Sequence, residues 1–154
     1  MDNSKIKSSL QDLIYRLQDA EKGFKEIKLA SSNAVLQKWL GRYAKERHQM
    51  HQTLEGLVAK LGGKADVDTT FLGDLHRIFI DIKINNTSLE NEFDAVVTEI
   101  ERGAKTLIKD YEKVLSDVEM PVEYVTTLVS QKAHIEVELQ SLVELKEEFN
   151  SVPA

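Results

Sequence analysis

Hydrophobic residues recur at alternating intervals of three and four positions over four long stretches of the chain. This spacing places them on one face of an α-helix and polar residues on the other. The pattern predicts helices over about 4–31, 33–62, 88–117 and 121–149. The stripe of the first helix is Leu10, Leu13, Leu17, Ala20, Phe24 and Ile27.

Polar and special residues mark where the predicted helices begin and end. Asn33 follows two serines and suits the N-cap of the second helix. Gly62 and Gly63 end that helix, and Pro121 suits the first turn of the fourth. The remaining stripes are Leu36, Leu40, Tyr43, Leu54, Leu57 and Leu61; Phe93, Val97, Ile100, Ala104, Leu107, Tyr111 and Val114; and Val125, Leu128, Ile135, Leu139, Leu142 and Phe149.

A long segment separates the second stripe from the third. It contains a possible cap at Asp68 and a short apolar helix predicted over about 69–84. The other two connections are short, so they join antiparallel neighbours. Two helical hairpins linked by one long crossover are typical of the ferritin-like four-helix bundle. We therefore predict a single all-α domain of this type over residues 1–154.

The composition of the chain argues against several classes of function. The net charge is −6, with Lys and Arg interleaved among acids, which argues against nucleic-acid binding. The absence of cysteine excludes disulfides, thiol catalysis and thiolate metal sites. No stretch approaches a membrane span, so we expect no membrane insertion and a cytoplasmic protein. No nucleophilic triad or phosphate-binding loop stands out, which favours a protein without enzymatic activity.

The two halves of the chain resemble each other. Glu21-Lys22-Gly23 matches Glu101-Arg102-Gly103 at an offset of 80, and Leu54-Glu55-Gly56-Leu57-Val58 matches Leu139-Gln140-Ser141-Leu142-Val143 at an offset of 85. The helical stripes also pass through Arg47 and Lys132, which are equivalent at the second offset. We therefore predict that each hairpin buries one ion pair, Glu21 with Arg47 and Glu101 with Lys132.

These residues give the chain a family resemblance. It resembles a bacterial ferritin-like family described only as a domain of unknown function, and the resemblance covers nearly the whole chain. It rests on Glu21-Lys22-Gly23-Phe24, Glu46-Arg47, Gly62-Gly63, Leu75-His76-Arg77, Glu101-Arg102-Gly103 and Tyr111. The resemblance implies a four-helix bundle that is often linked to stress responses and has no established activity.

Metal binding is the rival interpretation of the same acids. Ferritin-like di-iron proteins carry a Glu on two helices and Glu-x-x-His on the other two. Glu21 and Glu101 match the single acids, but the paired motifs read Glu46-x-x-Gln49 and Gln131-x-x-His134. The positive charges of Arg47 and Lys132 would repel a metal cation bound between the helices. Candidate ligands for iron, manganese or zinc are Glu21, Glu46, His48, His51, Glu101 and His134.

His48 and His51 lie three residues apart and can share a helix edge, where such a pair can bind zinc or nickel. Two ligands are too few for a site, so a polar helix face is the simpler interpretation. His134 lies off the core stripe, within reach of a carboxylate.

Apolar residues beyond the stripes suggest self-association. The crossover is richer in apolar residues than one buried stripe requires, and Trp39 falls off the main stripe of its helix. We expect a homodimer or other homo-oligomer. The leading hypothesis is a non-catalytic bundle that acts through self-association or an unidentified protein partner. The alternatives are a metal-binding protein and a carrier that holds a small ligand inside the bundle.

Overall fold

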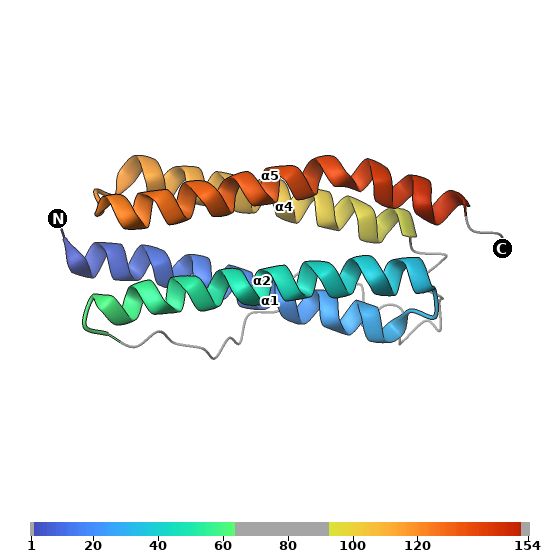
Figure 1. Cartoon of the computed structure of the whole chain (residues 1–154), viewed down its shortest axis with the longest axis horizontal. Coiled ribbons are helices and arrows are strands. Elements are labelled where there is room, and N and C mark those ends of the chain that lie inside the picture. Colours follow the sequence, from blue (N-terminus) through green and yellow to red (C-terminus); the bar gives the residue numbers. More distant parts are fainter. Residues whose placement is uncertain (1, 64–92, 152–154) are drawn as a thin grey trace.

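Four long helices form the part of the chain that the structure describes. The computed structural model describes residues 2–63 and 93–151. The helices are α1 (Asn3–Ala30), α2 (Ala34–Lys60), α4 (Phe93–Asp117) and α5 (Val122–Ser151) (Figure 1). Their bounds confirm the predicted helices to within a few residues, except that the predicted start of the third, at about 88, lies outside the described residues. The helix predicted over about 69–84 lies outside them too.

Local side-chain chemistry sets the helix ends. The Asp2 carboxylate accepts hydrogen bonds from the backbone N–H groups of Ser4 and Lys5 at the start of α1. Asn33 caps α2 as predicted, because its Oδ1 accepts from the N–H of Leu36 at 3.1 Å. After α2 the chain turns at Gly62, whose φ of +79° is favourable only for glycine.

The helices pair as two hairpins. α1 packs against α2, and α4 packs against α5. Contacts at the helix ends fix the relative directions of the two hairpins. Lys60 near the end of α2 pairs with Glu123 at the start of α5, and Lys38 near the start of α2 pairs with Glu148 near the end of α5. α2 and α5 are therefore antiparallel, α2 and α4 are parallel, and α4 begins at the opposite end of the bundle from the end of α2 (Figure 1).

The predicted stripes form the core. Every stripe residue of α1, α2 and α4 is buried or packs against the buried clusters. On α5 the buried stripe includes polar positions that the predicted stripe missed. It alternates steps of four and three through Tyr124, Leu128, Gln131, Ile135, Glu138, Leu142 and Leu145. Two polar residues, Gln131 and Glu138, therefore face the bundle interior.

Trp39 does not provide a free apolar surface. Its side chain is buried between α2 and α5, where its Nε1–H donates to Glu148 Oε2 at 2.5 Å and its ring lies 6.1 Å from that of Tyr43. The off-stripe apolar residues were expected either to cover the bundle or to form a dimer contact, and Trp39 covers the bundle. The apolar crossover, the other element of that expectation, lies outside the described residues.

None of the described helices combines the length and apolar character needed to cross a bilayer.

Candidate metal centre

Glu21 is a buried carboxylate in the middle of α1. It occupies the inward stripe itself, one helical turn from Leu17 and from Phe24, and its side chain is only 10% exposed. An acid in such a position needs compensating donors or cations, because an isolated buried charge is strongly destabilised.

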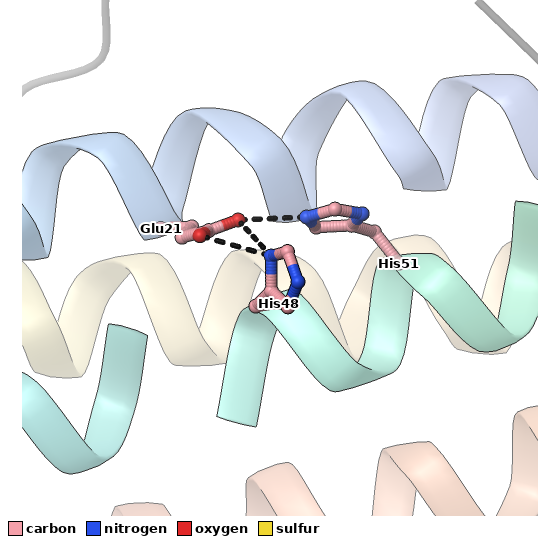
Figure 2. A group of neighbouring side chains, drawn as sticks. All are labelled: Glu21, His48 and His51. Carbon is pink, nitrogen blue, oxygen red and sulfur yellow. Dashed lines mark hydrogen bonds and ion pairs between the residues drawn. The ribbon is translucent and has the colours of Figure 1, made fainter. Parts of the chain in front are cut away.

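His48 and His51 on α2 both face this carboxylate (Figure 2). His51 Nε2 lies 2.7 Å from Glu21 Oε1, and His48 Nδ1 lies 3.1 Å from Glu21 Oε2. The two rings meet edge to face with centroids 5.0 Å apart. His51 is buried, whereas 45% of the His48 side chain is exposed. The pair is therefore more than a polar helix face, because a third ligand group from α1 completes it.

The three side chains are close to the geometry of a metal site. Their ligand atoms all lie within 4.8 Å of one another. Two ligands bound tetrahedrally to zinc at its usual bond lengths lie about 3.3 Å apart. The observed separations of 2.7 and 3.1 Å need only a small outward movement to admit an ion. Two imidazoles and one carboxylate would leave at least one coordination position for water.

A second layer of hydrogen bonds orients His51. Its Nδ1 lies 3.2 Å from Oε1 of Glu55, one turn further along α2. Gln18 of α1 donates from Nε2 to the same oxygen at 3.3 Å. A ring whose Nδ1–H donates to a carboxylate presents its Nε2 lone pair to a metal, and this carboxylate–histidine arrangement is common around bound zinc.

Cations hold Glu21 in its ionised form. Burial by itself raises the pKa of this carboxyl group, but hydrogen bonds from Lys25, His51 and His48 outweigh it, so the pKa is lowered overall. Lys25 Nζ lies 2.5 Å from Oε2, and most of the Lys25 side chain is exposed. Glu21 is therefore a carboxylate at neutral pH, as a metal ligand must be.

Arg47 is buried as predicted but has a different partner. Its Nη1 lies 2.7 Å from Oε2 of Glu138 on α5, with side chains 4% and 9% exposed. The predicted pair with Glu21 does not form, because Arg47 points across to the second hairpin while Glu21 faces the two histidines of its own hairpin. A buried charge pair therefore joins α2 to α5.

A second group of possible ligands surrounds this pair. His134 Nε2 lies 3.3 Å from Glu46 Oε2 and 3.6 Å from Glu138 Oε1, and the three ligand atoms lie within 4.8 Å of one another. Burial, together with the nearby Glu46, raises the pKa of Glu138 to about 8, although Arg47 opposes the shift. Burial also acts on Glu46, but its hydrogen bond with Glu138 and the charge of His134 lower its pKa overall.

This second group is a poorer metal site than the first. Arg47 already contacts both oxygens of Glu138, at 3.0 and 2.7 Å, so a metal there would face a fixed cation. The raised pKa of Glu138 also favours its protonated form, which is a poor metal ligand.

The remaining predicted residues do not join either group. Glu101 is largely exposed and pairs with Lys105 one turn along α4, which lowers its pKa. Lys132 lies beside the inward stripe of α5 and pairs with Glu136 at 3.6 Å. The predicted pairing of Glu101 with Lys132 is therefore wrong. The internal repeat does not extend to the candidate centre, since Ala133 and Glu136 occupy the positions equivalent to His48 and His51.

Glu55, Gln18 and Glu138 were missed in the sequence. Glu55 follows His51 by four residues, the spacing that brings side chains together on a helix face. Glu138 continues the alternation of three and four from Leu128, Gln131 and Ile135. Both signals were available, but polar residues on a core stripe are easily taken for gaps in it.

Comparison with known proteins places the chain in a family without naming an activity. Neither a curated protein nor a solved structure matches it significantly. Residues 5–117, which include all but the first two residues of α1, all of α2 and α4, and the candidate centre, match a family model described as Domain of unknown function (DUF2383). The match spans most of the chain, and the protein therefore belongs to the DUF2383 family.

Proposed function

We propose that this protein binds one divalent transition-metal ion between α1 and α2, with Glu21, His48 and His51 as its ligands. The observation that carries the proposal is the convergence of both histidines on one buried carboxylate, at 2.7 and 3.1 Å. The hydrogen bond that Glu55 accepts from Nδ1–H of His51 supports it, because it orients the ring as a ligand.

The ligand set indicates which ions to expect. Imidazole suits zinc, copper, iron and nickel, and two histidines with one carboxylate are found around catalytic zinc and non-haem Fe(II). Manganese and magnesium prefer sets richer in oxygen. We therefore expect zinc or Fe(II), with water in the remaining positions. The half-exposed ring of His48 gives the ion a route from solvent.

Cobalt(II) titration tests the proposal directly. Tag-free protein stripped with a chelator is titrated with Co²⁺, whose visible absorption reports coordination by protein ligands, and zinc is then used in competition. We expect one equivalent to bind to the wild type. Glu21→Gln and His51→Gln should each weaken binding by about a hundredfold or more, since each removes one of three ligands.

His134→Gln is the matched control. It removes a histidine that also contacts a carboxylate, but in the second group, so it should bind Co²⁺ like the wild type. If Glu21→Gln and His51→Gln retain normal affinity, the proposal fails. It also fails if His134→Gln is the variant that loses the ion, because the second group would then be the site.

We propose further that the bundle has ferritin-like topology. The support is the parallel orientation of α2 and α4, whose connection must span the length of the bundle. That arrangement matches the two hairpins with one crossover found in ferritin-like folds. A crystal structure in which the connection between α2 and α4 stays at one end of the bundle would exclude it.

Self-association is a second candidate property, supported by the outer face of α5. Four valines on this helix expose half or more of their surface: Val122, Val129, Val137 and Val143. We propose that this face pairs with a second copy of the chain.

Sedimentation equilibrium tests this pairing. The wild type should be a dimer, and a double variant with Val129→Lys and Val143→Lys should be a monomer. A monomeric wild type at high concentration would refute the idea.

A further inference from the structure

A cavity lies between α1 and α4, and none of the three proposed metal ligands is among the residues that line it. Its volume is about 210 Å³. Phe24, Ile100 and Leu107 provide apolar walls, and the buried side chain of Arg47 reaches it from α2. α1 and α4 contact each other sparsely, which leaves room for this space.

Arg47 has one donor that no residue in 2–63 or 93–151 satisfies. Its Nη1 contacts Glu138, but its Nε–H has no hydrogen-bond partner among these residues, although only 4% of the side chain is exposed. The guanidinium carbon lies 5.8 Å from the centroid of the Phe24 ring, which also lines the cavity. A buried donor without a partner is costly, so an acceptor supplied by a ligand or by water would stabilise it.

The two other arginines that line the cavity are each paired with an acid. Arg16 pairs with Asp110 at 3.2 Å, and Arg102 pairs with Glu99 at 2.9 Å. Both arginines expose about half of their side chains, so they mark the opening toward solvent. The unsatisfied donor therefore lies on the buried side of the cavity and belongs to a cation, which favours an anionic acceptor over a neutral one.

The volume limits the size of the ligand. An engineered cavity of about 150 Å³ holds benzene, whereas typical drug-sized sites begin near 300 Å³. A nucleotide or a long acyl chain is too large. We propose that this cavity binds a small aromatic or branched carboxylate, with the carboxylate accepting from Arg47 Nε–H and the apolar part lying against Phe24, Ile100 and Leu107.

Titration with sodium benzoate tests this site. In protein with labelled methyl groups, we expect saturable binding and intermolecular NOEs from the benzoate ring to the methyl groups of Ile100 and Leu107. Benzyl alcohol, which has the same ring without the charge, should bind about tenfold more weakly, because hydrogen bonds between charged groups are the stronger ones. Benzylamine should bind no better than the alcohol.

One variant isolates the role of Arg47. Arg47→Lys keeps a cation beside Glu138 but removes the Nε–H donor, so it should weaken benzoate binding by about tenfold and leave benzyl alcohol unaffected. The wild-type measurements decide the question if this variant does not fold. Absence of saturable benzoate binding, NOEs to other residues only, or equal affinity for benzoate and benzyl alcohol would each overturn the proposal and leave a water-filled cavity.

Discussion

Arg47 and Glu138 lie 91 residues apart in the sequence, yet their charged groups meet at 2.7 Å inside the bundle. Arg47 belongs to the first hairpin and Glu138 to the second. Their pairing is thus a polar contact across an interface that is otherwise formed mainly by apolar side chains.

The first prediction concerns the stability of this pair. Above pH 8, where Glu138 is ionised, Arg47→Met should lower the free energy of unfolding by about 3–5 kcal/mol, because it leaves a carboxylate buried without its cation. The double variant Arg47→Met with Glu138→Leu should recover most of that loss, since two apolar side chains need no compensation. Urea denaturation measures both. A single variant as stable as the wild type would show that the pair does not matter for folding.

The second prediction concerns pH. Glu138 has a pKa of about 8 in the folded protein against an ordinary value of 4.5, so between these values the folded state binds the extra proton. Stability from this group is therefore fully present below pH 4.5 and is lost as the pH rises through 8, with a slope on the order of 1 kcal/mol per pH unit at most. Urea denaturation at pH 5.5 and 7.5 should show the decline.

Glu138→Gln provides the comparison for that measurement. The amide cannot titrate, so the difference in stability between the two pH values should shrink relative to the wild type. Titrating groups that do not contact Glu138 are common to both proteins and cancel in the comparison, whereas the pKa of Glu46 changes with that of its neighbour. An identical pH dependence in the two proteins would contradict the raised pKa.

The third prediction concerns Glu55 as a positioning residue. Glu55→Gln leaves the three proposed ligands in place but replaces the carboxylate behind His51 with a neutral amide. The affinity for Co²⁺ should fall by about 10- to 100-fold while the bound stoichiometry and the shape of the absorption spectrum stay the same. A changed spectrum would mean that Glu55 is itself a ligand, and an unchanged affinity would mean that His51 needs no orienting partner.

The fourth prediction links the metal to stability. At zinc concentrations about 100 times the dissociation constant, the free energy of unfolding should rise by about 2.7 kcal/mol, because the ligands converge only in the folded state. Calorimetry with and without zinc measures the change. Zinc should raise the stability of the His51→Gln variant only slightly, and it should raise that of the His134→Gln variant as much as that of the wild type. A similar increase in both variants would indicate binding elsewhere.

The fifth prediction uses two glycines in and just after α2. A Cβ at Gly56 would meet no atom within 4 Å, so Gly56→Ala should stabilise the protein by about 0.5–1 kcal/mol. Gly62 has equal space, but its φ is +79°, and Gly62→Ala should destabilise by about 1 kcal/mol. Thermal unfolding of the two variants should therefore shift in opposite directions. Shifts of the same sign would show that backbone conformation does not distinguish the two positions.

The helices and their buried faces could be predicted from the sequence, because packing requires apolar residues to recur at the helical period. The stripes through Leu10–Ile27 and Leu36–Leu61 identified the buried faces, and Asn33 and Gly62 marked the ends, since capping depends on residues close in sequence. The inward position of Arg47 followed from the same periodicity. These inferences use only neighbours along one helix.

The contacts between side chains of different helices could not be predicted from the sequence, because they depend on the axial register in which the helices pack. Periodicity placed Arg47 inside but did not distinguish Glu21 from Glu138 as its counter-charge. Lys132 was misplaced because the α5 stripe was followed through apolar residues alone, whereas the buried residue there is Gln131. The joining of Glu21 to both histidines likewise required knowledge of how α1 and α2 are aligned.

Three consecutive residues at the middle of α2 reach different neighbours. Glu46 lies against His134, Arg47 against Glu138, and His48 against Glu21. Each residue of a helix advances about 1.5 Å and turns about 100° relative to the one before it. Adding or deleting a single residue between Asn33 and this turn would rotate all three side chains away from their neighbours together. A change in chain length within the first half of α2 is thus expected to break several polar contacts at once.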